Sequence, residues 1–154
     1  MRAKVSTISI LLIVLLIWAV VATTLAAYFY NEYTTMERLY KSLKGKVVVI
    51  NIGIDYGNGT LQWFNGTVLP VGSTVLSALI SVSRVEYVYG PYGAYVVSIN
   101  GVREKIVSKS EGHSWIWYLY NATTGKLEYG PVAADKYILS SGQIIVWKYT
   151  HWKF

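Results

Sequence analysis

The hydrophobic pattern divides the chain into one long apolar run and a series of short alternating segments. Residues 5–30 contain no charged side chain, and the most apolar stretch starts at Ile8 and ends at Ala27. A helix of that length is about 30 Å long, which matches the hydrocarbon core of a bilayer. Because unpaired backbone groups are costly in lipid, this run predicts a transmembrane helix that contacts the lipid bilayer.

The flanks of the run predict its orientation. Arg2 and Lys4 precede it, and the aromatic residues 28–30 follow it at the depth of the membrane interface. We therefore expect a single-pass protein of the cell membrane, with a cytoplasmic N-terminus and an extracytoplasmic C-terminal domain. The basic residues between 38 and 46 argue weakly for the opposite orientation.

A cleaved signal peptide is the alternative to a retained anchor. Signal peptides have an apolar region of about 7–15 residues and a small-residue cleavage site. The run here is longer, and residues 24–26 (TLA) are a poor match to such a site. The retained anchor is favoured, and both alternatives export the remaining chain.

Residues 31–45 continue with helical periodicity. Met36, Leu39, Tyr40 and Leu43 recur at helical spacing, and Gly45 ends the pattern in the manner of a C-terminal helix cap. The pattern predicts a helical stalk that continues from the membrane helix, because no proline intervenes. The predicted organisation is therefore an anchor at 1–30, a stalk at 31–45 and a domain at 46–154.

From residue 47 the period changes from 3.6 to 2, which predicts strands. The first hairpin is predicted at 47–54 and 60–69. One face of its first strand is predicted to carry the apolar stripe Val48, Ile50, Ile52 and Ile54. In its second strand Leu61, Trp63 and Leu69 share one face, opposite Gln62 and Phe64. Residues 72–74 offer a capping hydroxyl for a helix that ends near Arg84 and lies across the hairpin. Further strands are predicted at 85–89, 95–99, 115–120, 136–139 and 143–149, separated by turns that include residues 111–112. This order predicts an α+β fold of β-grasp (ubiquitin-like) type, with one helix on a mixed β-sheet.

The composition of the chain excludes several classes of function. The chain has no cysteine, which excludes a disulfide scaffold, a thiolate metal site and a cysteine nucleophile. The exported part carries 12 basic and 8 acidic residues, and the basic ones are scattered along it. A mild, dispersed positive charge does not favour nucleic acid as a partner.

Three Asn-x-Thr tripeptides are candidate glycosylation sites. Their acceptors are Asn58, Asn65 and Asn121. Glycosylation would fit an exported domain. The alternative is that Asn-Gly pairs simply form turns.

No reaction chemistry is evident in the sequence. His113 and His151 lack metal-ligand spacing, and we expect His113 in an exposed loop. Residues 55–60 resemble a turn more than a calcium loop, because spaced oxygen ligands are missing. The acidic residues are isolated, and no nucleophile or phosphate-binding motif occurs. We therefore expect a protein that is not an enzyme and that holds no metal or cofactor.

Aromatic residues are the enriched feature, with 14 Tyr and 6 Trp. In the segment 115–120 (WIWYLY) large side chains alternate to both faces of a strand, so one face is predicted to be core. If the other face is exposed, it forms with nearby loop tyrosines a candidate ligand- or partner-binding set: Tyr89, Tyr92, Tyr95, Tyr118 and Tyr120. The alternative is ordinary cross-strand packing.

Five stretches together resemble a known family. They are GSTVLSAL at 72–79, YGAYVVSING at 92–101, WIWYLYN at 115–121, YGPVAADKYIL at 129–139 and SGQIIVWKY at 141–149. In order and spacing they are similar to the transcobalamin-like C-terminal β-grasp domain, which also occurs as an exported prokaryotic domain of unknown function. Gln143 and the longer turn at 121–125 depart from the family pattern.

The resemblance implies a fold and an exported location. In transcobalamin-like proteins this module forms one wall of a corrin site, and a large helical domain forms the other. The present sequence carries no such helical domain, so we do not expect it to hold cobalamin tightly by itself. The expected function is a membrane-anchored extracytoplasmic module for protein interaction or envelope assembly. The alternative is capture of a small molecule, corrin-like or otherwise planar.

Overall fold

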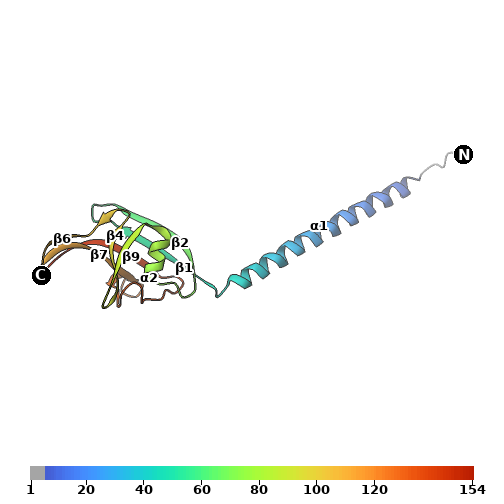
Figure 1. The fold of residues 1–154 in the computed structure, drawn as a ribbon. Coiled ribbons are helices and arrows are strands. Elements are labelled where there is room, and N and C mark those ends of the chain that lie inside the picture. Colours follow the sequence, from blue (N-terminus) through green and yellow to red (C-terminus); the bar gives the residue numbers. More distant parts are fainter. Residues whose placement is uncertain (1–5) are drawn as a thin grey trace. The chain divides into compact units, whose positions relative to one another are not determined.

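The computed structural model describes residues 6–154, and the chain divides into two compact units between residues 44 and 45 of the sequence. The first unit contains helix α1 (Thr7–Leu43), and the second contains one helix and nine strands. Arg2 and Lys4, on which the predicted orientation depends, lie outside the described residues. Figure 1 shows the helix and the folded domain.

Helix α1 runs without interruption from Thr7 to Leu43, across the described part of the predicted anchor and most of the predicted stalk. It begins where the Ser6 hydroxyl accepts a hydrogen bond from the Ile8 amide, and it ends just before Gly45, which has a φ of 85°. Among the described residues it is the one helix long and apolar enough to cross a bilayer. The hydroxyls of Thr23 and Thr24 bond to carbonyls of their own helix, at 2.8 and 2.7 Å, so they add no unsatisfied groups to the apolar run. A helix of this kind serves either as a membrane anchor or as a signal sequence.

The larger sheet of the second unit is mixed. Its strands are β1 (Val47–Asp55), β2 (Leu61–Pro70), β6 (Lys105–Ser108), β7 (Glu111–Asn121), β8 (Lys126–Tyr129) and β9 (Ile144–Lys153). The order is β2-β1-β9-β7-β6, and β8 also pairs with β7. The first and last strands, β1 and β9, are parallel neighbours, whereas the other pairs are antiparallel.

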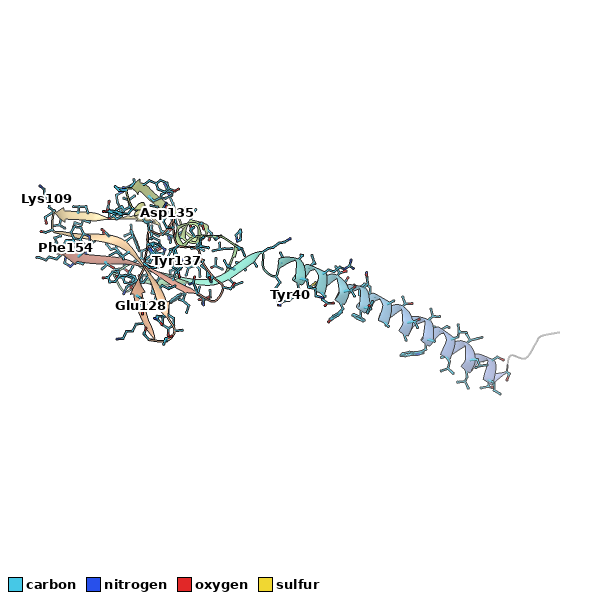
Figure 2. The ribbon with its side chains drawn as sticks, turned by 90° about the horizontal axis from the view of Figure 1, so that it is seen from below. Tyr40, Lys109, Glu128, Asp135, Tyr137 and Phe154 are labelled. Carbon is cyan, nitrogen blue, oxygen red and sulfur yellow. The ribbon has the colours of Figure 1, made fainter. Side chains whose placement is uncertain are left out.

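A second sheet joins β3 (Val85–Gly90), β4 (Gly93–Ile99) and β5 (Val102–Arg103). The β6–β7–β9 end of the larger sheet carries the C-terminus. There the amide of Phe154 bonds to the Ser110 carbonyl, and Figure 2 shows Lys109 and Phe154 at this same end. The domain is therefore α+β with mixed and antiparallel sheets.

The core lies between one face of the larger sheet, helix α2 (Val75–Val82) and the side chains of Val96 and Ile99 on β4. Figure 1 shows the ribbon of α2 among these strands. The predicted β1 stripe is confirmed, because Val48, Ile50, Ile52 and Ile54 are all buried. The predicted cap of α2 is also confirmed. Thr74 and Ser77 form a reciprocal capping box that satisfies donors at the helix start.

The predicted common face of Leu61, Trp63 and Leu69 in β2 is wrong. Ile52 of β1 pairs with Phe64, and Ile50 pairs with Thr67, so the register shifts between these two positions. Gly66 takes a φ of 65° at this shift. An extra residue in a strand reverses the facing of all residues beyond it. Leu69 therefore points to the core, while Leu61 and Trp63 are about half exposed on the other side, at 48% and 44%.

The predicted strand at 136–139 is also wrong, since only an isolated bridge joins Ile138 to Thr74. The backbone of this segment instead serves α2: carbonyls of Ala134 and Tyr137 accept bonds from the first amides of the helix. Asp135 and Tyr137 are labelled in Figure 2. The predicted turn at 111–112 belongs to β7, which begins earlier than expected. Strands β5, β6 and β8 were not predicted.

Candidate binding face

The face of the larger sheet that points away from the core is rich in exposed apolar side chains. An antiparallel sheet with one solvated face normally places polar residues there. Here the outward positions of four strands carry large apolar groups that are 39–69% exposed: Val49, Leu61, Trp63, Val68, Tyr120, Leu127 and Tyr129. We call this set the outer face. A cluster of exposed apolar groups of this kind is a candidate interaction surface.

The outer face is hollowed into a groove with a volume of about 390 Å³. It is lined by Asp55, Leu61, Trp63, Tyr120, Leu127, Ile144, Val146 and Lys148. The indole of Trp63 lies over Gly53 of the neighbouring strand, where an added Cβ would be 3.0 Å from the ring. Gly53 therefore lets the indole lie close against the backbone of β1.

One end of the groove is charged. The Nζ of Lys148 lies 3.6 Å from Oδ2 of Asp55, and it also lies 6.0 Å from the centre of the Tyr118 ring. The other lining residues are apolar or aromatic. The groove thus suits a group that is apolar along most of its length and polar at one end.

The two predicted tyrosines of β7 differ in exposure. Tyr120 lines the groove and is 39% exposed, whereas Tyr118 is 9% exposed. The ring of Tyr118 lies 4.8 Å from that of Tyr129, and burial followed by the hydrogen bond to Tyr129 raises the pKa of Tyr118. Tyr118 is thus buried beneath the outer face, and Tyr120 forms part of its surface.

The other three predicted tyrosines belong to the smaller sheet or to its β3–β4 turn. Tyr89 and Tyr92 are 70% and 91% exposed near the β3–β4 turn, next to a second hollow that includes Pro91 and Ala133. Tyr95 reaches β7 instead: its hydroxyl lies 2.5 Å from the Glu104 carboxylate and 3.0 Å from the Ser114 hydroxyl. Burial and the bond to Glu104 raise the pKa of Tyr95. The five predicted residues therefore do not share one surface.

Sequence reasoning missed Leu61, Trp63 and Leu127 as surface residues. Strict alternation through β2 predicts a common face for Leu61, Trp63 and Leu69, and Leu69 is buried. The pair Asn65-Gly66 was the available signal, since glycine inside a strand often marks a bulge.

The three candidate glycosylation acceptors lie at turns or irregular positions. Asn58 is exposed in the β1–β2 turn, where its Oδ1 accepts a bond from the Thr60 amide at 3.0 Å. Asn65 is exposed beside the β2 bulge. Asn121 ends β7, and its Nδ2 donates to Glu128 at 2.8 Å. The turn interpretation therefore describes Asn58 well, and modification of all three remains a prediction.

The two histidines lie side by side in the larger sheet, although they are far apart in sequence. His113 is not in an exposed loop, because it lies on β7 directly opposite His151 of β9, with ring centres 4.8 Å apart. The Nε2 of His151 lies 3.1 Å from Glu111, and bonds from His151 and Lys153 lower the pKa of this carboxyl. Within residues 6–154, no three metal-ligating side chains come together.

Comparisons with known proteins place the domain in a family. No curated protein matches the chain. A solved structure of a candidate metal binding protein from Ruminococcus gnavus ATCC 29149 is similar in fold, with a TM-score of 0.51 and 18% identity over 70% of this chain and 98% of that one. Haptocorrin in complex with Cbi gives a TM-score of 0.49 and 16% identity, over 68% of this chain and 26% of haptocorrin. Residues 72–151 match the family described as a domain of unknown function, DUF4430, and the chain belongs to that family.

Proposed function

We propose that the chain is a membrane-anchored extracytoplasmic module that binds a protein partner through the outer face of its larger sheet. The observation that carries this proposal is the exposure of Leu61, Trp63 and Leu127 on a face where solvent normally favours polar groups. The partner surface we propose is apolar, with an acidic or polar group near Lys148. Binding, rather than catalysis or a bound cofactor, is the role that this surface supports.

The apolar groups of the outer face would contribute favourably to association with an apolar partner. Fully burying a large apolar side chain contributes about 1.5–3 kcal/mol. Trp63, Leu61 and Leu127 are roughly half buried already, so covering each would add about 1 kcal/mol. Several such groups at the centre of an interface, with a polar rim, are the usual composition of a binding hot spot.

The fold proposal is that this domain is of the β-grasp, transcobalamin-like type. The parallel pairing of the first and last strands, with the β1–β2 hairpin on one side and α2 over the sheet, supports it. The five sequence stretches between residues 72 and 149 support it independently. Export of the domain is part of the same proposal.

The proposed topology is tested by adding protease to intact cells. Cleavage of the domain, together with a full-length mass for the untreated membrane protein, is expected. A domain that stays intact when protease is added outside the cells would overturn the proposed orientation. An N-terminus near residue 27 would replace the anchor with a signal peptide.

The partner proposal is tested by site-specific photo-crosslinking of the full-length chain in its own membrane. A photoreactive residue at Tyr120 is expected to give one defined protein adduct. The matched control is the same residue at Ile138, which is 62% exposed but lies beside α2, away from the outer face. The double variant Leu61→Lys, Leu127→Lys should abolish the Tyr120 adduct. Equal adducts from both positions, or an adduct unaffected by the lysines, would refute the proposal.

A second candidate function is capture of a planar small molecule in the groove. The groove volume of about 390 Å³ falls at the lower end of known ligand pockets, and the rings of Trp63 and Tyr120 both line it. Cyanocobalamin is the first probe, measured by equilibrium dialysis. Retention that is lost in Trp63→Ala but kept in Ile138→Ala would favour capture over partner binding.

A further inference from the structure

Helix α1 carries one apolar stripe of constant phase through both its membrane and stalk parts. In the stalk, Tyr33, Met36, Tyr40 and Leu43 are spaced alternately by three and four residues, which is the a/d pattern of a coiled coil. Between residues 31 and 44, Leu39 is the one large apolar residue outside these positions. The four stripe residues are 55–67% exposed, so the chain's own helix leaves them uncovered.

The same phase continues into the membrane run. Stepping back from Tyr33 by four and then three residues reaches Phe29, Ala26, Ala22 and Ala19. Three of the four alanines of the run therefore fall on the stripe. Small residues let two helices approach closely in lipid, whereas an exposed apolar stripe in water requires cover. These two different requirements are met by one surface of one helix.

We infer that two copies of this chain associate in parallel along the α1 stripe, in a left-handed coil that spans the membrane and the stalk. This inference rests on the proposed retention of α1 as an anchor. A second copy is the occupant that fits best, because membrane insertion gives every copy the same direction and depth. Identical a/d positions then meet at the same height without further alignment.

Charges beside the stripe are compatible with this pairing. In a parallel pair, Glu32 of one helix faces Glu37 of the other, which alone would be unfavourable. Glu37 is already paired within its own helix, with Lys41 Nζ at 2.6 Å from its carboxylate. The 37-residue helix is about 55 Å long, so stalk turns extend past the hydrocarbon core and make the association visible to water-soluble reagents. Figure 2 shows Tyr40 in this part of the helix.

The absence of cysteine allows a clean test. Four full-length single-cysteine variants are made, two on the stripe (Met36→Cys and Leu43→Cys) and two one position away (Thr35→Cys and Ser42→Cys). Helix axes in such pairs are about 8–10 Å apart, so only stripe cysteines come within disulfide distance. All four side chains are exposed, so the substitutions disturb no core.

The variants are oxidised in native membranes and the products are separated by gel electrophoresis. Disulfide dimers at 36 and 43 should form at least about tenfold faster than at 35 and 42. Equal rates at all four positions, no dimer, or adducts only with other proteins would overturn the inference. The mass of the monomer in the same membranes reports whether the anchor is retained. Partner capture at Tyr120 is measured separately, so failure of one proposal is distinguishable from failure of the other.

Discussion

Two identical tripeptides, Tyr-Gly-Pro at 89–91 and 129–131, provide a direct test of how tertiary packing decides the cost of a mutation. Neither Gly90 nor Gly130 has a positive φ, so alanine is compatible with the backbone at both positions. A Cβ on Gly90 would meet nothing closer than 3.9 Å. A Cβ on Gly130 would lie 2.0 Å from Cε2 of Trp117. We therefore expect Gly130→Ala to destabilise the domain and Gly90→Ala to be tolerated.

The magnitude follows from the position of Trp117. Its ring is buried, and its Nε1 donates to the Val132 carbonyl at 3.1 Å. To reach ordinary contact distance the ring must move by about 1.4 Å, within a packed core. Overpacking of this kind costs about 1–3 kcal/mol, and loss of the hydrogen bond adds about 0.5–1.5 kcal/mol. Gly130→Ala should therefore lower the free energy of unfolding by about 2–4 kcal/mol, and Gly90→Ala should leave it unchanged or raise it by up to about 1 kcal/mol.

The assay is urea unfolding of the full-length chain in detergent micelles, followed by near-ultraviolet circular dichroism. A loss of 2–4 kcal/mol corresponds to a midpoint about 1–2 M lower at an unchanged slope. A third variant, Trp117→Leu, removes the ring that clashes. Adding Gly130→Ala to it should cost less than about 0.5 kcal/mol, which is a large departure from additivity. Equal midpoints for Gly130→Ala and Gly90→Ala, or additive costs with Trp117→Leu, would refute the packing argument.

Three further predictions concern single interactions. Hydrogen bonds from His151 and Lys153 hold the pKa of Glu111 below its usual 4.5. Ionised Glu111 therefore stabilises the domain above pH 4.5, and this contribution is lost as the pH falls through the lowered pKa. Glu111→Gln should flatten the acid side of a plot of stability against pH, and an unchanged acid side would contradict the prediction. Thr74→Ala removes the α2 capping box and should lower the free energy of unfolding, measured by urea unfolding, by about 0.5–2 kcal/mol. The control is the substitution of an exposed surface serine by alanine, which should leave that free energy unchanged. Because the pKa of Tyr95 is raised, its stabilising effect is present below pH 10 and declines as the pH rises further. Tyr95→Phe should therefore weaken the loss of stability at alkaline pH. If an absorbance titration showed Tyr95 ionising with an ordinary tyrosine pKa, that would argue against the bond to Glu104.

The identity of several elements was predictable because local pattern and tertiary role agree. The β1 stripe alternates strictly, and all four of its members are buried. Thr74 stands just before an apolar helical pattern, and it caps α2. The apolar stretch from Ile8 to Ala27 is helical throughout, as its pattern predicts.

The candidate face was only partly predictable. Tyr120 belongs to the predicted binding set, whereas strict alternation predicts Trp63 on the same face as the buried Leu69. The bulge beside Gly66 reverses the facing of β2, and no periodicity within the strand records that reversal. His113 was expected in a loop because Gly112 suggested a turn, yet Gly112 lies on β7 against the indole of Trp152.

The sequence by itself determined the long helix, the alternation of β1, the cap of α2 and the absence of cysteine chemistry, since each depends on residues close together in the chain. Only the tertiary structure decided the order of strands, the pairing of His113 with His151, and the different environments of Gly90 and Gly130. It also decided that residues 136–139 cap a helix instead of forming a strand. These features depend on contacts between residues far apart in sequence, and local propensity carries no information about which distant partner a segment meets.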